Sequence, residues 1–227
     1  MNRDAFLQRI REAAASGRRF KVHVRRDITH EQGRADTDEE VFDRYVREAA
    51  NAGGRVTRVD SWSVAQQEIG KFFRQYEPRS AICWRHPTLD QLRLSEVLAE
   101  HGIEKVDFES LAPLSPASQR AKMLAADVGI TSTTWAVAET GSLLCAHGPM
   151  NERLASLVPP VHLAVVERKQ IVADLFDAFA KLGERSLDAF PSNATFITGP
   201  SKTGDIETKL VTGVHGPGKW HLIVVDV

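Results

Sequence analysis

Short apolar runs alternate with helix-length amphipathic segments along most of this 227-residue chain. The runs of strand length are residues 55–59, 80–84, 105–108, 128–131, 142–145, 162–166, 194–198 and 221–225. Helices are predicted at 4–15, from a capping box at 37–40 to Gly53, and at 63–76, 90–101, 116–126, 169–182 and 205–212, with a short helical turn at 133–138. Because parallel strands need such long crossover connections, this alternation predicts an α/β fold with a mainly parallel sheet and helices on both faces.

The first 52 residues differ in character from the rest of the chain. Residues 4–15 carry a helical apolar stripe that includes Phe6 and Ile10, whereas residues 25–37 are polar and aperiodic and predict a poorly ordered loop. We therefore predict an N-terminal helical segment with a polar loop at 1–52 and an α/β domain at 53–227. A short isolated helix is marginally stable in water, so its stripe should pack on the domain or on another subunit.

The charge balance and the absence of long apolar stretches limit the partners and the compartment. The 29 basic and 30 acidic side chains nearly cancel, so the chain as a whole attracts neither nucleic acid nor an anionic membrane surface. No apolar stretch approaches the roughly 20 residues that span a bilayer, and the charged start lacks the apolar core of a secretory signal. These observations predict a cytoplasmic protein without a membrane span.

The two cysteines are predicted to be buried structural thiols. Cys83 and Cys145 both lie in strand-like apolar runs, a setting that favours core packing over a nucleophile or a disulfide. A cysteine-ligated iron-sulfur cluster usually takes about four thiolates, so the chain cannot build one alone. The histidines show no HExxH or closely spaced Cys/His pattern, and no metal site is predicted.

A glycine-rich loop at 199–207 joins a predicted strand to the predicted helix at 205–212. Backbone N–H groups at such a helix start can face an anion, to which Ser201 and Thr203 would add hydroxyl donors and Lys202 a positive charge. The loop therefore predicts a phosphate or carboxylate site. The alternative is a tight turn in which Asp205 caps the helix.

Two further turns carry candidate catalytic side chains. Glu139, at a predicted element boundary, could act as a nucleophile or transfer protons; alternatively it is a solvated carboxylate at a helix end. His215 lies in the loop 213–218, where Gly216 permits close approach of the backbone to a ligand. This histidine could transfer protons near neutral pH, or it could only stabilise the loop.

All of these turns flank predicted strands, so we expect them to converge in one cleft at the C-terminal edge of the sheet. The predicted catalytic residues are Glu139 and His215. The predicted anion-binding or substrate-binding residues are Gly199, Ser201, Lys202, Thr203, Asp205 and Gly216.

Taken in order, the motifs resemble the LUD domain of the lactate-utilization protein C family (LutC/YkgG). The matching segments, within about residues 125–227, are 129–131, 138–141, 158–162, 199–207 and 213–218. The resemblance implies a fold similar to the NagB/RpiA/CoA-transferase-like group and a role in oxidising L-lactate to pyruvate with two partner proteins. It also implies that the iron-sulfur clusters belong to those partners and that this chain carries no cofactor, which agrees with its two cysteines.

A second hypothesis is a stand-alone enzyme or binding protein for a phosphorylated or CoA-linked small molecule. In that case Glu139 would be the nucleophile or base, the loop around Lys202 would hold the anion, and His215 would be an auxiliary acid. The short Glu-Thr-Gly sequence at 139–141 resembles the glutamate-containing turn of CoA transferases. No CoA-specific segment accompanies it.

Overall fold

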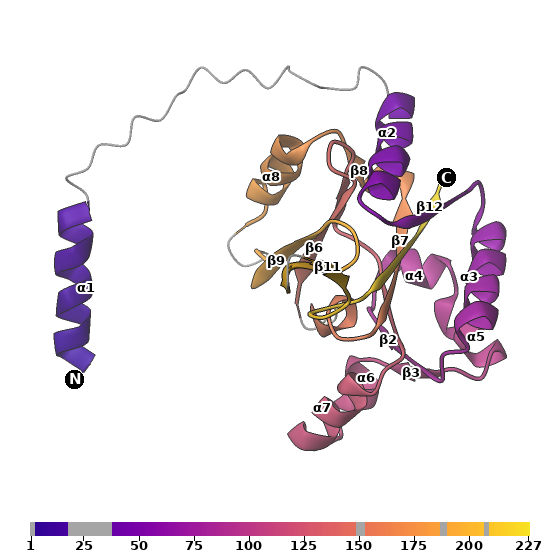
Figure 1. Cartoon of the computed structure of the whole chain (residues 1–227), viewed down its shortest axis with the longest axis horizontal. Helices are drawn as coiled ribbons and strands as arrows, with labels where there is room; N and C mark the ends of the chain where they lie inside the picture. Colours follow the sequence, from indigo (N-terminus) through magenta and orange to yellow (C-terminus); the bar gives the residue numbers. More distant parts are fainter. Residues whose placement is uncertain (1–2, 18–37, 149–152, 187–189, 207–208) are drawn as a thin grey trace. The chain divides into compact units, whose positions relative to one another are not determined.

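The computed structural model describes residues 3–17, 38–148, 153–186, 190–206 and 209–227. The chain divides into two units, residues 1–32 and 33–227. The first unit contains helix α1 (Arg3–Gly17) (Figure 1). Its Phe6 and Ile10 side chains are exposed. Docking of this stripe stays a prediction, and the loop predicted at 25–37 lies outside the described residues.

The second unit is built on a six-stranded sheet in the order β1-β12-β7-β4-β2-β3. The strands are β1 (Arg55–Val59), β2 (Ser80–Cys83), β3 (Glu104–Val106), β4 (Val128–Thr131), β7 (Val161–Glu167) and β12 (Lys219–Val225). Every neighbouring pair is parallel. Strands β4 and β7 are buried at every position, which explains why most of their residues are apolar. The predicted α/β fold with a mainly parallel sheet is confirmed.

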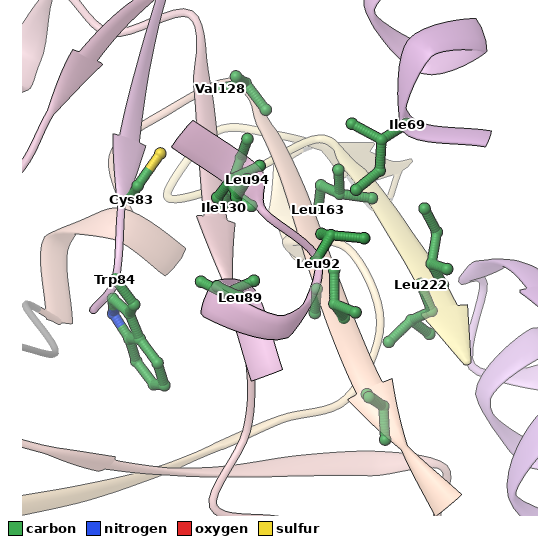
Figure 2. Packing of buried hydrophobic residues seen from close by; sticks show 14 of the residues in the cluster. Ile69, Cys83, Trp84, Leu89, Leu92, Leu94, Val128, Ile130, Leu163 and Leu222 are labelled. Atoms are coloured by element: carbon green, nitrogen blue, oxygen red, sulfur yellow. The ribbon is translucent and has the colours of Figure 1, made fainter. Parts of the chain in front are cut away.

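One face of this sheet is covered by α3 (Trp62–Tyr76), α4 (Pro87–Gln91) and α5 (Leu94–Glu100). The hydroxyl of Tyr76 in α3 lies 2.9 Å from Nε2 of His221, which places α3 on the face to which His221 points. Figure 2 shows the apolar side chains of these helices gathered with those of the sheet. They include Ile69, Leu89, Leu92, Ile130 and Leu163.

The opposite face carries α2 (Asp38–Asn51), whose Phe42, Tyr45 and Ala49 are buried in the core. Successive strand residues point to opposite faces, so Trp220 points away from His221. A methyl group added to Gly54 would lie 2.8 Å both from the Trp220 ring and from the Ala49 carbonyl, so the end of α2 is packed beside Trp220. Helix α2 thus belongs to the α/β unit, although our predicted N-terminal part, residues 1–52, included it.

A second sheet, in the order β8-β5-β6-β9, lies on the α2 side. Its strands are β5 (Trp135–Val137), β6 (Ser142–His147), β8 (Ile171–Val172) and β9 (Asn193–Ile197). The helical turn predicted at 133–138 is wrong, because β5 pairs antiparallel with β6. Gly141, with φ +65°, lies in the connection between them, and a methyl group there would come within 2.2 Å of the Ala49 nitrogen of α2.

The helix predicted at 205–212 is also wrong. This segment contributes to an antiparallel hairpin of β10 (Lys202–Ile206) and β11 (Lys209–Thr212), in which Thr203 pairs with Val211. Asp205 therefore lies in a strand and cannot be the N-cap of a helix that is not formed.

Other helix boundaries differ from the predicted ones for local reasons. The helix predicted at 90–101 is divided into α4 and α5 by Arg93, whose φ of 56° is incompatible with a continuous helix. The helix predicted at 169–182 starts only at α8 (Leu175–Gly183), where the Asp174 side chain accepts a hydrogen bond from the Asp177 N–H. The remaining helices are α6 (Phe108–Leu111), α7 (Pro116–Leu124), η1 (Arg153–Ser156) and η2 (Arg168–Gln170).

Candidate functional site

The chain leaves the neighbouring strands β2 and β4 toward opposite faces of the parallel sheet. Strand β2 continues into α4 and α5 on one face, and β4 continues into the second sheet on the other. In open α/β sheets, ligands bind outside the carboxyl ends of the strands at such a point. The residues that follow β2 and β4 here are Trp84, Arg85, His86, Ser132 and Thr133.

A buried polar network occupies this carboxyl edge. Glu167, buried at the end of β7, accepts a 2.5 Å hydrogen bond from the Thr88 hydroxyl and forms a 2.5 Å ion pair with Lys169. The Gln170 side chain accepts from the Glu167 N–H at 2.8 Å and donates to the Thr133 carbonyl. Buried polar groups must be paired, so these bonds fix the ends of α4, β4 and β7 relative to one another.

Two buried histidines lie on the side of the second sheet. His162 Nε2 is 2.8 Å from the Thr131 hydroxyl at the end of β4, and His162 Nδ1 has no hydrogen-bond partner among the described residues. His147 Nε2 lies 3.1 Å from the Thr195 hydroxyl, and its ring packs edge-on against Trp84. Burial lowers the pKa of His162 to about 3, so this imidazole is neutral at physiological pH.

The buried His162 predicts a loss of stability in mild acid. The unfolded chain takes up a proton near the ordinary pKa of 6.5, whereas the folded protein does not until about pH 3. The free energy of unfolding therefore falls as pH drops below 6.5, by about 1.4 kcal/mol per pH unit for this one group. Urea unfolding measures the free energy of unfolding at pH 7 and at pH 5. The decrease between the two pH values should be about 2 kcal/mol smaller in His162→Gln than in the wild type. Equal losses in the two proteins would contradict the assignment.

The two predicted glycine-rich loops lie together, but not at the predicted edge. The Ser201 N–H donates to the Pro217 carbonyl at 2.9 Å, and the Gly213 N–H donates to the Ser201 carbonyl at 2.8 Å. A methyl group on Gly216 would lie 3.3 Å from the Ser201 Cβ. Because the second loop leads into the first residue of β12, both loops lie at the amino-terminal edge of the parallel sheet. The predicted location at the C-terminal edge is therefore wrong for these loops.

The individual residues of these loops are mostly exposed. Lys202 and His215 are exposed, and Ser201, Thr203 and Gly216 are half-buried. Gly199 has φ +85° and lies against the end of α2, where a methyl group would come within 2.2 Å of the Ala52 carbonyl. The Asp205 side chain lies outside the described part of the chain. Anion binding by this group of residues stays a prediction.

Glu139 lies in the turn between β5 and β6 and is exposed. Its Oε2 accepts a 3.5 Å hydrogen bond from the N–H of Leu175, the first residue of α8, where a carboxylate is electrostatically favourable. The same turn is connected to the Gly199 loop by hydroxyl groups, since Ser142 Oγ lies 2.7 Å from Thr140 Oγ1 and 2.6 Å from Thr198 Oγ1. A catalytic role for Glu139 stays a prediction.

Lys202 has a structural partner that the sequence did not suggest. Its Nζ donates to the Ala52 carbonyl at 3.3 Å, beside the end of α2, where the helix dipole favours a positive charge. We expect Lys202→Ala to lower the free energy of unfolding by about 0.3–1 kcal/mol at low ionic strength, and by less in 1 M salt. Urea titrations at the two salt concentrations measure this difference. A loss that does not depend on salt would contradict a role through charge.

The cysteines are buried, as predicted for structural thiols. Burial raises the pKa of both Cys83 and Cys145 to about 12, so neither is a thiolate at neutral pH. Among the described residues, no group of three or more His, Cys, Asp or Glu side chains is arranged to hold a metal ion. The described ranges also contain no helix with the length and apolar character needed to cross a membrane.

Comparison with known proteins decides the family. The model of the LUD domain matches residues 42–225, from within the first half of α2 to the last residue of β12. This chain belongs to the LUD domain family. The resemblance of the loop motifs is thereby confirmed, and the LUD match covers the parallel sheet, the second sheet and the β10–β11 hairpin.

The LUD domain protein described here has relatives that match over most of their length. It is 28% identical over 232 residues to lactate utilization protein C of Halalkalibacterium halodurans, covering 99% of this chain and 97% of that protein. Lactate utilization protein C of Geobacillus sp. (strain WCH70) is 33% identical over 147 residues, which cover 63% and 61% of the two chains. A crystal structure of a DUF162 family protein from Deinococcus radiodurans superposes with a TM-score of 0.60 at 21% identity, covering 84% of this LUD protein and 99% of that chain. This likeness shows the fold.

The carboxyl-edge network of this LUD domain was not predicted as a site. Thr88 and Glu167 are 79 residues apart in the sequence and belong to no short motif. The available indication was a charged residue, Glu167, directly after the apolar run Leu163–Val166, where a buried carboxylate must find partners. The site was predicted at the glycine-rich loops instead, because a glycine pattern can be recognised in a single sequence.

Proposed function

We propose that this protein is a cytoplasmic subunit of a system that oxidises L-lactate to pyruvate together with iron-sulfur partner proteins. The observation that carries the proposal is the match to lactate utilization protein C of H. halodurans, which extends over 99% of this chain. Membership of the LUD domain family is consistent with it.

The number of cysteines in this chain supports placing the iron-sulfur clusters of such a system on the partner proteins. Oxidation of lactate to pyruvate releases two electrons, which a redox centre must accept. An iron-sulfur cluster usually takes about four thiolates. This chain has two cysteines, buried in different sheets, so we assign the clusters to the partners. The role left for this chain is to bind the carboxylate substrate or to hold the complex together.

Isolation of the assembled system tests this proposal. The protein, tagged at its native locus, is purified from cells grown on L-lactate, and the co-purifying proteins, iron and flavin are measured. We expect two cysteine-rich partners and iron in the complex, and none in the protein expressed alone. Isolation without iron or partners from lactate-grown cells would contradict the proposal. It would favour a stand-alone protein for a CoA-linked or phosphorylated molecule, which a thermal-shift screen with those ligands would then detect.

A further inference from the structure

A cavity of about 350 Å³ lies at the carboxyl edge, beyond the ends of β7 and β12. It is bounded by the first half of α2, the η2–β8 segment and the last residue of the chain. The lining residues are Val41, Phe42, Arg168, Lys169, Ile171 and Val227. This composition, an apolar wall with a few polar groups, is typical of small-molecule sites, and the volume is near the lower end of their usual range of about 300–1,000 Å³.

The arginines beside this cavity are held in place by stacking and ion pairs. The guanidinium groups of Arg58 and Arg168 lie 4.5 and 4.7 Å from the centre of the Phe42 ring. Both pair with Asp226, which follows β12. Burial alone would raise the pKa of Asp226, but hydrogen bonds from Arg168 and Arg58 lower it below its usual value, so the carboxylate stays ionised and orients both groups.

The charged side chains that line the cavity are both positive. Arg168 pairs with Asp226 and Lys169 pairs with Glu167, but neither carboxylate lines the cavity. Each carboxylate is more buried than its basic partner: the Glu167 side chain is 3% exposed against 66% for Lys169, and the Asp226 side chain 18% against 32% for Arg168. A ligand in the cavity therefore meets a guanidinium and an ammonium, apolar surface from α2 and β8, and Val227.

We propose that this cavity binds a small carboxylate with a short apolar body. Its carboxylate contacts Arg168 and Lys169, and its apolar part contacts Val41, Phe42 and Ile171. Arginine and lysine bind carboxylates through charge-assisted hydrogen bonds, which are stronger than neutral ones. The inference does not depend on the proposed function, although L-lactate and pyruvate belong to this chemical class.

An NMR titration with isovalerate tests the proposal, with isovaleramide as the uncharged isostere. In the methyl spectrum, isovalerate should shift the signals of Val41 and Ile171, whereas isovaleramide should bind at least about tenfold more weakly, because its amide lacks the negative charge. L-lactate and pyruvate are titrated in parallel. If isovalerate binds and L-lactate does not, the cavity is confirmed and the substrate of the proposed function lies elsewhere.

Two variants separate charge from shape. Lys169→Gln should weaken isovalerate binding about tenfold, with a smaller effect in high salt, because it removes one cation from the lining. Val41→Phe should abolish binding by filling the cavity while leaving every charge in place, and Val214→Phe, on an exposed loop at the other edge, should bind as the wild type does. Equal affinity for isovalerate and isovaleramide, shifts confined to other methyl groups, or unchanged binding in Val41→Phe would overturn the proposal.

Discussion

Gly129→Ala is expected to destabilise the protein by about 3 kcal/mol or more, at or above the upper end of the usual cost of overpacking a core. Gly129 lies in the central strand β4, and a methyl group added there would come within 1.6 Å of the carbonyl oxygen of Ala155 in η1. The obstacle is backbone, which cannot rotate away as a side chain would. Urea unfolding followed by circular dichroism measures the loss.

Gly183→Ala is the matched control for this substitution. Gly183 is the last residue of α8, and a methyl group added there would meet nothing within 4 Å. We expect Gly183→Ala to change the free energy of unfolding by no more than about 1 kcal/mol, and to raise it if residue 183 stays helical. If Gly129→Ala were as stable as Gly183→Ala, the packing of η1 against β4 described here would be wrong.

Glu167→Ala is expected to cost about 2–4 kcal/mol, because it opens a small cavity and leaves a buried hydroxyl without its acceptor. The hydroxyl belongs to Thr88, which is 1% exposed and donates to Glu167 Oε1. The ammonium of Lys169 also loses its partner, but it is exposed and can be hydrated. Denaturant titration at pH 7 gives the free energy of unfolding of the variant.

A surface carboxylate provides the comparison for Glu167. Glu96 forms an ion pair with Arg93, and both side chains are more than half exposed. Glu96→Ala should therefore change the free energy of unfolding by less than about 0.5 kcal/mol. Similar losses in Glu167→Ala and Glu96→Ala would show that the carboxyl-edge network contributes no more than a surface pair.

The sequence predicted those elements whose pattern is set by their own residues. Strand β7 was predicted at 162–166 because Leu163–Val166 is an apolar run, and α3 because its apolar residues recur at helical spacing. Strands β5 and β11 were predicted as helical and most of β10 as a loop, since their strand conformation depends on pairing with β6 and with each other. Pairing between strands is a tertiary effect that overrides weak local preference.

The candidate site was less predictable than the fold. The glycine-rich loops were recognised, and the proximity of Ser201 to Gly216 follows the expectation that they share a region. The edge at which the 213–218 loop lies could have been inferred from chain direction, because a loop that precedes a strand of a parallel sheet lies at its amino-terminal edge. The contact of the 199–207 loop with it could not, since that contact is tertiary. Likewise, the convergence of Phe42, Arg58, Arg168 and Asp226 joins four distant segments, and no periodicity or motif connects them.

The most direct test of the central claim is growth on L-lactate as the sole carbon source after deletion of the gene. The proposed role in lactate oxidation predicts that the deletion strain fails to grow on L-lactate, grows normally on pyruvate, and recovers when a plasmid supplies the wild-type chain. Normal growth of the deletion strain on L-lactate, in a host without a second LUD domain protein, would contradict the role proposed here.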